Sequence, residues 1–232
     1  MTQESLAVDV LQQLADKLKA TGLADRPGRL LYSGISTLAP GKLYMLGYNP
    51  GGDPAGESDS PKTHLEKLSR QRSDWNEYVD GCWRPAGRIC APGDAPMQRR
   101  VQHLLAGIGI PVRSVAASNV IFVRSRDAKS LEAPSQLAER CWPVHEFMLG
   151  VVQPSVILSI GGNLVFDFVR RKGRLLSPIR NFPSGHGDWQ CQSARIGLGG
   201  APMTLIAVPH LARYAINNYP NVIPWVRAQM AA

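Results

Sequence analysis

The chain has 232 residues, 44% of them hydrophobic, which is enough to bury one substantial core and gives no sign of a second domain. Its 26 Lys and Arg residues outnumber its 18 Asp and Glu residues, so the net charge of +8 favours a polyanionic partner, nucleic acid first of all. No apolar run approaches the length that spans a bilayer, so we exclude an integral membrane protein and expect no membrane partner.

The N-terminus and the cysteines bear on location and cofactors. Residues 1–5 lack the basic and apolar regions of a secretory signal, so we expect the protein in the bacterial cytosol or nucleoid. The four cysteines contain no C-x-x-C pair, the close spacing that a zinc or iron–sulfur site needs. We therefore expect reduced cysteines that mostly serve packing, and neither a metal nor a cofactor.

The first predicted elements are a helix and a buried strand. Apolar residues at helical spacing predict a helix over residues 5–21. A connector follows, in which Arg26 and Arg29 are consistent with ordinary surface side chains. The apolar run over residues 43–46 predicts a strand buried on both faces, which ends abruptly in a loop of turn-forming residues.

The next part of the chain is polar and then returns to regular structure. A short helix is possible over residues 64–78, and no strand is expected there. Asp94 is a candidate N-cap for a helix over residues 98–107. A second apolar strand is predicted over residues 114–118, and it ends at Asn119.

The last third alternates helices and strands. Pro134 opens a predicted helix that runs to about Val151, and a third strand is expected over residues 154–160. A helix over residues 164–171 ends in a basic cluster that suits the helix dipole as well as it suits a phosphate backbone: Arg170, Arg171, Lys172 and Arg174. A short strand pair near residues 190–197 precedes the fourth apolar strand, over residues 203–208.

Four buried strands separated by helical connections predict an α/β protein with a parallel sheet covered on both faces, because parallel pairing requires crossovers. Asn49, Asn119 and His210 each follow one of these strands. The carboxyl ends of parallel strands meet at one edge of the sheet. The three polar side chains are therefore expected to line one pocket.

Three motifs in this order resemble the uracil-DNA glycosylase superfamily. Gly47-Tyr-Asn-Pro-Gly51 is similar to the first motif of its mismatch-specific and single-strand-selective branches, in which the Asn positions the attacking water. Ser118-Asn119, followed by Val-Ile-Phe-Val-Arg124, resembles the strand whose Asn reads the base edge. Val208-Pro-His210-Leu-Ala-Arg-Tyr214 resembles the second motif, with His-Leu-Ala in place of the usual His-Pro-Ser.

This resemblance implies a fold, a reaction and a partner. The fold is a three-layer αβα domain over residues 1–232, with a central four-stranded parallel sheet in the order 2-1-3-4. The function is that of a DNA repair enzyme, a monofunctional glycosylase that hydrolyses the N-glycosidic bond of uracil or a related damaged base in DNA. The protein would be a monomer that needs no cofactor.

The resemblance also assigns roles to the strand-end residues. Asn49 would orient the attacking water, and His210 would donate a hydrogen bond to O2 of the leaving base. Asn119 would pair with N3 and O4 of uracil, which the edge of cytosine would not satisfy. Because Asn49 is not a carboxylate, we expect slower turnover than an Asp or Glu at this position would give.

Further residues are expected to surround the flipped base. The first-motif residues Gly47, Tyr48, Pro50 and Gly51 would line the pocket, and the stacking platform would be one of Trp75, Tyr78 and Trp83. The expected DNA contacts are Arg124, Arg213 and Tyr214, of which Arg213 and Tyr214 are candidates for the wedge that fills the gap left by the base.

Two other kinds of protein remain open. The first is a non-catalytic nucleic-acid or nucleotide-binding domain that keeps this fold, consistent with the altered second motif and the missing carboxylate. The second is an unrelated doubly wound hydrolase or cofactor binder. The second is disfavoured because the glycines at 107–109 precede their strand and those at 161–162 lack the spacing of a phosphate-binding loop.

Overall fold

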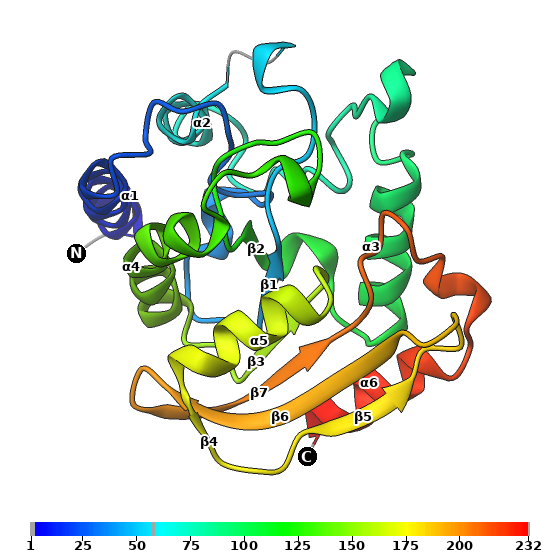
Figure 1. Ribbon diagram of the computed structural model, residues 1–232. Helices are drawn as coiled ribbons and strands as arrows, with labels where there is room; N and C mark the ends of the chain where they lie inside the picture. Colours follow the sequence, from blue (N-terminus) through cyan, green and yellow to red (C-terminus); the bar gives the residue numbers. More distant parts are fainter. Residues whose placement is uncertain (1–2, 57–58, 232) are drawn as a thin grey trace.

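The computed structural model describes residues 3–56 and 59–231, which form a mixed α/β fold around a seven-stranded sheet (Figure 1). The strands are β1 (Leu43–Gly47), β2 (Ala116–Asn119), β3 (Val156–Ser159), β4 (Arg174–Leu175), β5 (Arg180–Pro183), β6 (Gln190–Leu198) and β7 (Ala201–Ala207). The α-helices are α1 (Gln3–Ala20), α2 (Pro61–Leu68), α3 (Pro96–Gly107), α4 (Pro134–Val152), α5 (Asn163–Lys172) and α6 (Val222–Ala231).

Four adjacent strands, β2, β1, β3 and β7, run parallel, in the 2-1-3-4 order expected from the sequence. Every residue of β1, β2 and β3 is buried, as expected for strands covered on both faces. Tyr44 lies opposite Ala116 and Ile157, and Ile157 lies opposite Leu205. The four carboxyl ends therefore reach the same edge of the sheet.

The sheet is larger than the four strands expected. β6 continues it antiparallel to β7, and β4 and β5 pair antiparallel with β6. The expected short strand pair near residues 190–197 is instead one nine-residue strand with partners on both sides. Ala194 and Ile196 of β6 are buried while Arg195 between them is exposed, an alternation typical of antiparallel strands.

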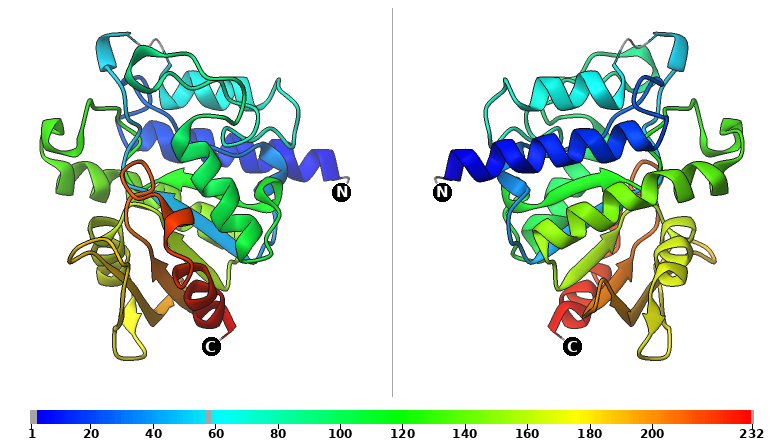
Figure 2. Two further views of the ribbon diagram at one scale, coloured as in Figure 1. Left: turned by 90° about the vertical axis from the view of Figure 1, so that its right-hand side faces the viewer. Right: turned by 90° about the vertical axis from the view of Figure 1, so that its left-hand side faces the viewer.

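Helices cover both faces of the sheet, which gives three layers. On one face, Tyr44 and Leu46 of β1 belong to a core shared with α1, α4 and α5. On the other, Leu43 and Met45 belong to a core shared with α3 and α6. Figure 2 shows α3 and α6 in front in one view and α1 and α4 in front in the opposite view. The sheet is thus fixed from both sides, which holds its strand ends rigidly.

Three helices differ from expectation. α2 spans Pro61–Leu68, earlier than residues 64–78, because the Ser60 side chain accepts a hydrogen bond from the Thr63 backbone N–H (3.2 Å) and caps the helix there. Asp94 does not cap α3; Gln98 Oε1 accepts from the Ala95 N–H (3.0 Å) instead. α6 was not predicted, although Pro224 lies in its first turn, where a proline is tolerated.

The described residues also bear on membranes, metals and cysteines. None of their helices combines the length and apolar character of a membrane span. They include no group of three or more His, Cys, Asp or Glu side chains that could hold a metal ion. Cys141 and Cys191 are buried in the two cores, as expected for packing residues, whereas Cys82 is exposed.

Candidate active site

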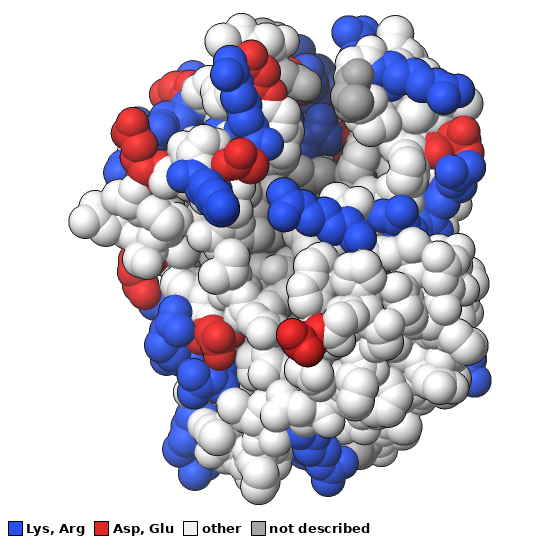
Figure 3. Space-filling model, turned by 45° about the vertical axis from the view of Figure 1, so that its right-hand side comes forward, with Lys and Arg blue, Asp and Glu red and all other residues white. Residues whose placement is uncertain are grey.

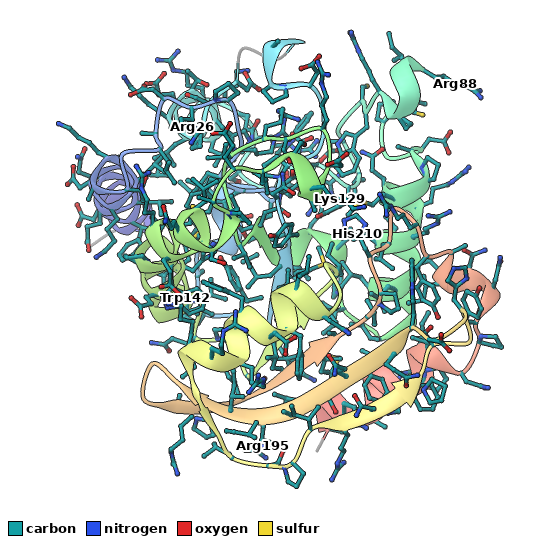
Figure 4. The ribbon with its side chains drawn as sticks, viewed as in Figure 1. Arg26, Arg88, Lys129, Trp142, Arg195 and His210 are labelled. Atoms are coloured by element: carbon teal, nitrogen blue, oxygen red, sulfur yellow. The ribbon has the colours of Figure 1, made fainter. Side chains whose placement is uncertain are left out.

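A cavity of about 1210 Å³ opens at the carboxyl ends of the parallel strands. Asn49, Asn119 and His210, from the ends of β1, β2 and β7, all line it. Figure 3 shows the hollow with Lys and Arg side chains along much of its border, and Figure 4 shows His210 on the segment that follows β7. The three residues that sequence reasoning placed at one edge therefore do face one space.

The loop after β1 is joined to the segment after β2 along its whole length. Backbone N–H groups of Val120 and Ile121 donate to the carbonyls of Gly47 and Tyr48 (3.0 and 2.9 Å). The Ser125 N–H donates to the carbonyl of Pro50 (3.1 Å). The loop that carries Asn49 is thus an extension of the sheet rather than a free turn.

Gly47 lets Asn119 lie directly against the end of β1. The two residues are register partners, and a Cβ added at Gly47 would lie 2.0 Å from Asn119 Oδ1. Real Cβ contacts are essentially never shorter than 3.0 Å, so any larger residue at position 47 would displace the Asn119 amide. This close approach, rather than a special backbone angle, requires the glycine.

The Asn49 side chain has a fixed orientation. Its Nδ2 donates to the carbonyl of Pro50 (2.9 Å) and to Ser125 Oγ (2.8 Å), and it lies 3.4 Å from the Val123 carbonyl. Backbone carbonyls can only accept, so the nitrogen must be the atom that faces them. Among the described residues no hydrogen-bond donor reaches Oδ1, which leaves that oxygen to orient a water molecule or a ligand in the cavity.

Asn119 is 6% exposed, and its Nδ2 is buried with no hydrogen-bond partner among the described residues. An unpaired buried amide costs about 1–3 kcal/mol. The neighbouring Tyr32 hydroxyl is neutral, because burial raises its pKa more than Arg29 and Arg124 lower it. The Asn119 amide also lowers the pKa of Tyr32, but the two side chains are not in hydrogen-bonding geometry. A ligand acceptor in the cavity would complete the amide's bonding.

His210 is a neutral imidazole with its proton on Nε2. The Ala212 backbone N–H donates to His210 Nδ1 (3.3 Å), and a backbone N–H can only donate, so Nδ1 carries no proton. Burial lowers the pKa of the half-buried ring, and the nearby Arg213 lowers it further. Nε2–H is consequently the donor that His210 can offer to a bound molecule.

His145, which sequence reasoning missed, supports the end of β2 from beneath. Its Nε2 lies 3.2 Å from the Val120 carbonyl and its Nδ1 lies 2.9 Å from the Tyr44 hydroxyl, and all three residues are buried. Burial lowers the pKa of His145 to about 4, so the ring is neutral and holds both bonds. The available signal was a polar residue on the apolar face of the predicted helix over 134–151.

Arg29 and Glu77 form a wall of the cavity that the sequence did not reveal. Arg29 Nη1 lies 2.7 Å from Glu77 Oε1, and the two side chains are only 16% and 13% exposed. Arg29 is therefore not the ordinary surface residue expected. Glu77 also accepts hydrogen bonds from the indoles of Trp75 and Trp83 (3.2 Å each), so it fixes the orientation of this wall.

Of the three aromatic candidates for the stacking platform, two line the cavity and one does not. Trp83 and Tyr78 line the cavity and pack against Tyr32, whose ring is stacked on Tyr78 at 5.7 Å between centroids. Trp75 does not line the cavity, so its expected role as platform is wrong. Tyr32, which no motif marked, belongs to the wall instead.

Three other expected contacts need correction. Pro50 is buried behind the loop and does not line the cavity, unlike Gly47, Tyr48 and Gly51. Tyr214 is fully buried, with its hydroxyl donating to the Ser184 carbonyl (2.5 Å), so it cannot act as a wedge. Arg124 is 8% exposed and donates to the Gly51 carbonyl, which makes it a support for the loop rather than an outer DNA contact.

Exposed charges of both signs lie at the mouth of the cavity. Arg84, Arg126 and Arg213 are exposed there, against the exposed carboxylates of Asp127 and Asp188. The basic cluster at the end of α5 does not line the cavity, and Lys172 in it pairs with Glu139. Arg213 thus keeps the place at the rim expected of it.

The cavity offers a neutral imidazole donor, an unpaired amide and an oriented amide oxygen, set among aromatic rings and rimmed by arginines. Such a set can bind a planar heterocycle by its edge, stabilise negative charge that develops on it, and hold a water beside it. No protein-family model matches the chain, and no curated protein matches it in sequence.

Proposed function

We propose that the protein is a DNA glycosylase of the uracil-DNA glycosylase type, which hydrolyses the N-glycosidic bond of uracil or a related damaged base in DNA. The observation that carries the proposal is the convergence of Asn49, Asn119 and His210 from three strand ends on one cavity. In the same proposal the protein acts as a monomer in the bacterial cytosol or nucleoid, without a cofactor.

The chemistry needs little acid–base machinery. Cleavage of the glycosidic bond leaves negative charge on the base, and His210 Nε2–H can donate to the O2 atom on which that charge develops. A water held by Asn49 Oδ1 then attacks the electron-poor sugar carbon and gives up a proton to solvent, and the anionic base takes up a proton from solvent, so the products are the free base and an abasic sugar. An amide can orient this water because the bond to the base breaks ahead of the attack.

A preference for uracil over cytosine follows from the amide of Asn119. Nδ2 is a donor and suits uracil O4, while Oδ1 is an acceptor and suits uracil N3–H. Cytosine presents the opposite pattern at both positions, which would leave buried groups unpaired. The target base must leave the helical stack to reach this amide, and Tyr32, Tyr78 and Trp83 supply an aromatic wall for it.

The altered second motif is compatible with activity. His-Leu-Ala replaces the usual His-Pro-Ser, yet the Ala212 N–H still orients the imidazole, and Leu211 is a fully buried anchor for the segment. The rim arginines and the net charge of +8 favour a DNA backbone near the cavity.

The test is excision from uracil-containing oligonucleotides, single- and double-stranded, with alkali to cleave abasic sites and a thymine oligonucleotide of the same sequence as control. We expect alkali-sensitive products from the uracil substrates only. Binding of these oligonucleotides without abasic sites would refute glycosylase activity and support a non-catalytic nucleic-acid-binding domain.

A further inference from the structure

Trp189 is an exposed aromatic residue at the mouth of the cavity. It is 39% exposed and lines the opening, although it lies far from the three motifs in the sequence. It occupies the loop over residues 184–189 between β5 and β6, which lies beside the segment following β7 (Figure 1). An indole has a large flat apolar face, so an exposed indole beside a cavity can stack on a ring of a bound molecule.

The indole is held in place before anything binds. The backbone N–H of Trp189 donates to the His186 carbonyl (3.2 Å), and the Trp189 carbonyl accepts from the Ser184 backbone N–H (3.0 Å). The His186 ring packs against the indole with 4.7 Å between centroids, and its Nδ1 lies 2.9 Å from the Tyr219 hydroxyl. Tyr219 is in turn stacked on the buried Tyr214 at 4.7 Å. This row of rings connects Trp189 to the core.

The charges around Trp189 indicate which part of a nucleic acid it meets. Asp188, next to it, is exposed on the same rim, and its carboxylate would repel a phosphate group. The exposed arginines on this rim, Arg84, Arg126 and Arg213, are the groups that attract phosphates. Contact of Trp189 with a base is therefore more favourable than contact with the phosphate backbone.

We propose that Trp189 is a stacking platform for the base next to the one that enters the cavity, on an unpaired strand of DNA. The inference rests on the proposed function for the identity of the neighbouring nucleotide. In a duplex both faces of that base are covered by its neighbours, so only an unstacked base can lie on the indole. Base–aromatic stacking predicts that Trp189→Ala weakens single-strand binding about 5- to 150-fold.

The experiment measures binding of labelled single-stranded oligonucleotides by fluorescence anisotropy, with Asn49→Ala in all proteins to slow excision. One oligonucleotide carries a uracil between normal neighbours, and two others replace the 5′ or the 3′ neighbour by a nucleotide without a base. We expect Trp189→Ala to weaken binding of the oligonucleotide with both neighbouring bases. On one of the two oligonucleotides that lack a neighbouring base, the same substitution should leave the affinity unchanged. Trp189→Phe should keep most of the affinity.

Two further variants test the charge and the location. Asp188→Asn should strengthen binding of all three oligonucleotides equally, because it removes a repulsion of the backbone. Leu176→Ala changes a side chain that is also 39% exposed but lies outside the cavity lining, and it should have no effect.

Equal losses on all three oligonucleotides for Trp189→Ala would overturn the proposal, since the residue would then act through the shape of its loop. An equal loss in binding of dUMP would also overturn it, because Trp189 would then contact the base inside the cavity. The binding readout separates this proposal from the function: binding that depends on the neighbouring base without excision refutes only the glycosylase activity, and excision without that dependence refutes only the platform.

Discussion

Replacing Gly47 by Ala should impair excision while leaving the fold nearly intact. The added Cβ would lie 2.0 Å from Asn119 Oδ1, and a tolerable contact needs at least 3.0 Å, so the Asn119 amide must move by about 1 Å or more. The atom that must move is the end of a side chain rather than backbone, so the cost to folding is small. A misplacement of about 1 Å at a reacting centre costs on the order of 10²-fold in rate.

The assay for Gly47→Ala is single-turnover excision from a uracil oligonucleotide, with urea unfolding as the measure of stability. Gly51→Ala is the matched control, because a Cβ there meets nothing within 4 Å although the residue lines the same cavity. We expect a loss of about 10²-fold for the first variant and a rate near wild type for the second. If a folded Gly47→Ala protein excised uracil at the wild-type rate, the position of Asn119 would not depend on a glycine at residue 47.

Four further predictions concern the strand-end residues, the rim and the core. Asn49→Ala and His210→Ala should each slow single-turnover excision by about 10²–10³-fold with DNA affinity little changed, and wild-type rates in both would remove their roles. Asn119→Asp should shift excision toward cytosine or abolish it, so unaltered uracil excision would exclude base reading by this residue. Arg213→Ala should impair excision from duplex more than from single strands, since only a paired base leaves a gap to fill; equal losses would reduce Arg213 to general electrostatics. The pKa of buried His145 is lowered to about 4, so between pH 6.5 and 4 the unfolded state binds a proton that the folded state does not, and this one residue should lower the stability by about 3 kcal/mol; His145→Gln should reduce, by that amount, the fall measured by urea unfolding.

The parallel half of the sheet could be predicted because its signal is local. β1, β2 and β3 are short runs that need burial on both faces, and a polar residue lies at or just past the carboxyl ends of β1, β2 and β7. That pattern was enough to bring Asn49, Asn119 and His210 to one cavity. The antiparallel half was underestimated, because the alternation in β6 becomes meaningful only when β5 and β7 lie beside it.

The walls of the site depend on contacts between distant parts of the chain. Arg29 and Glu77 are 48 positions apart in sequence, and nothing local marks them as an ion pair at a cavity. Tyr214 follows His210 closely and resembles a surface wedge in sequence, yet its ring points into the core. Trp189 was not predicted because its exposure is set by the hairpin loop that holds it.

The central claim is that the cavity releases a base from DNA, and quantifying free uracil tests it most directly. The wild-type protein is incubated in excess with a uracil-containing single strand, and free uracil is measured by mass spectrometry beside abasic sites in the same sample. We predict one free uracil for each abasic site formed, with formation slowed about 10²–10³-fold in Asn49→Ala. Oligonucleotide binding by the wild-type protein with no free uracil would contradict the account.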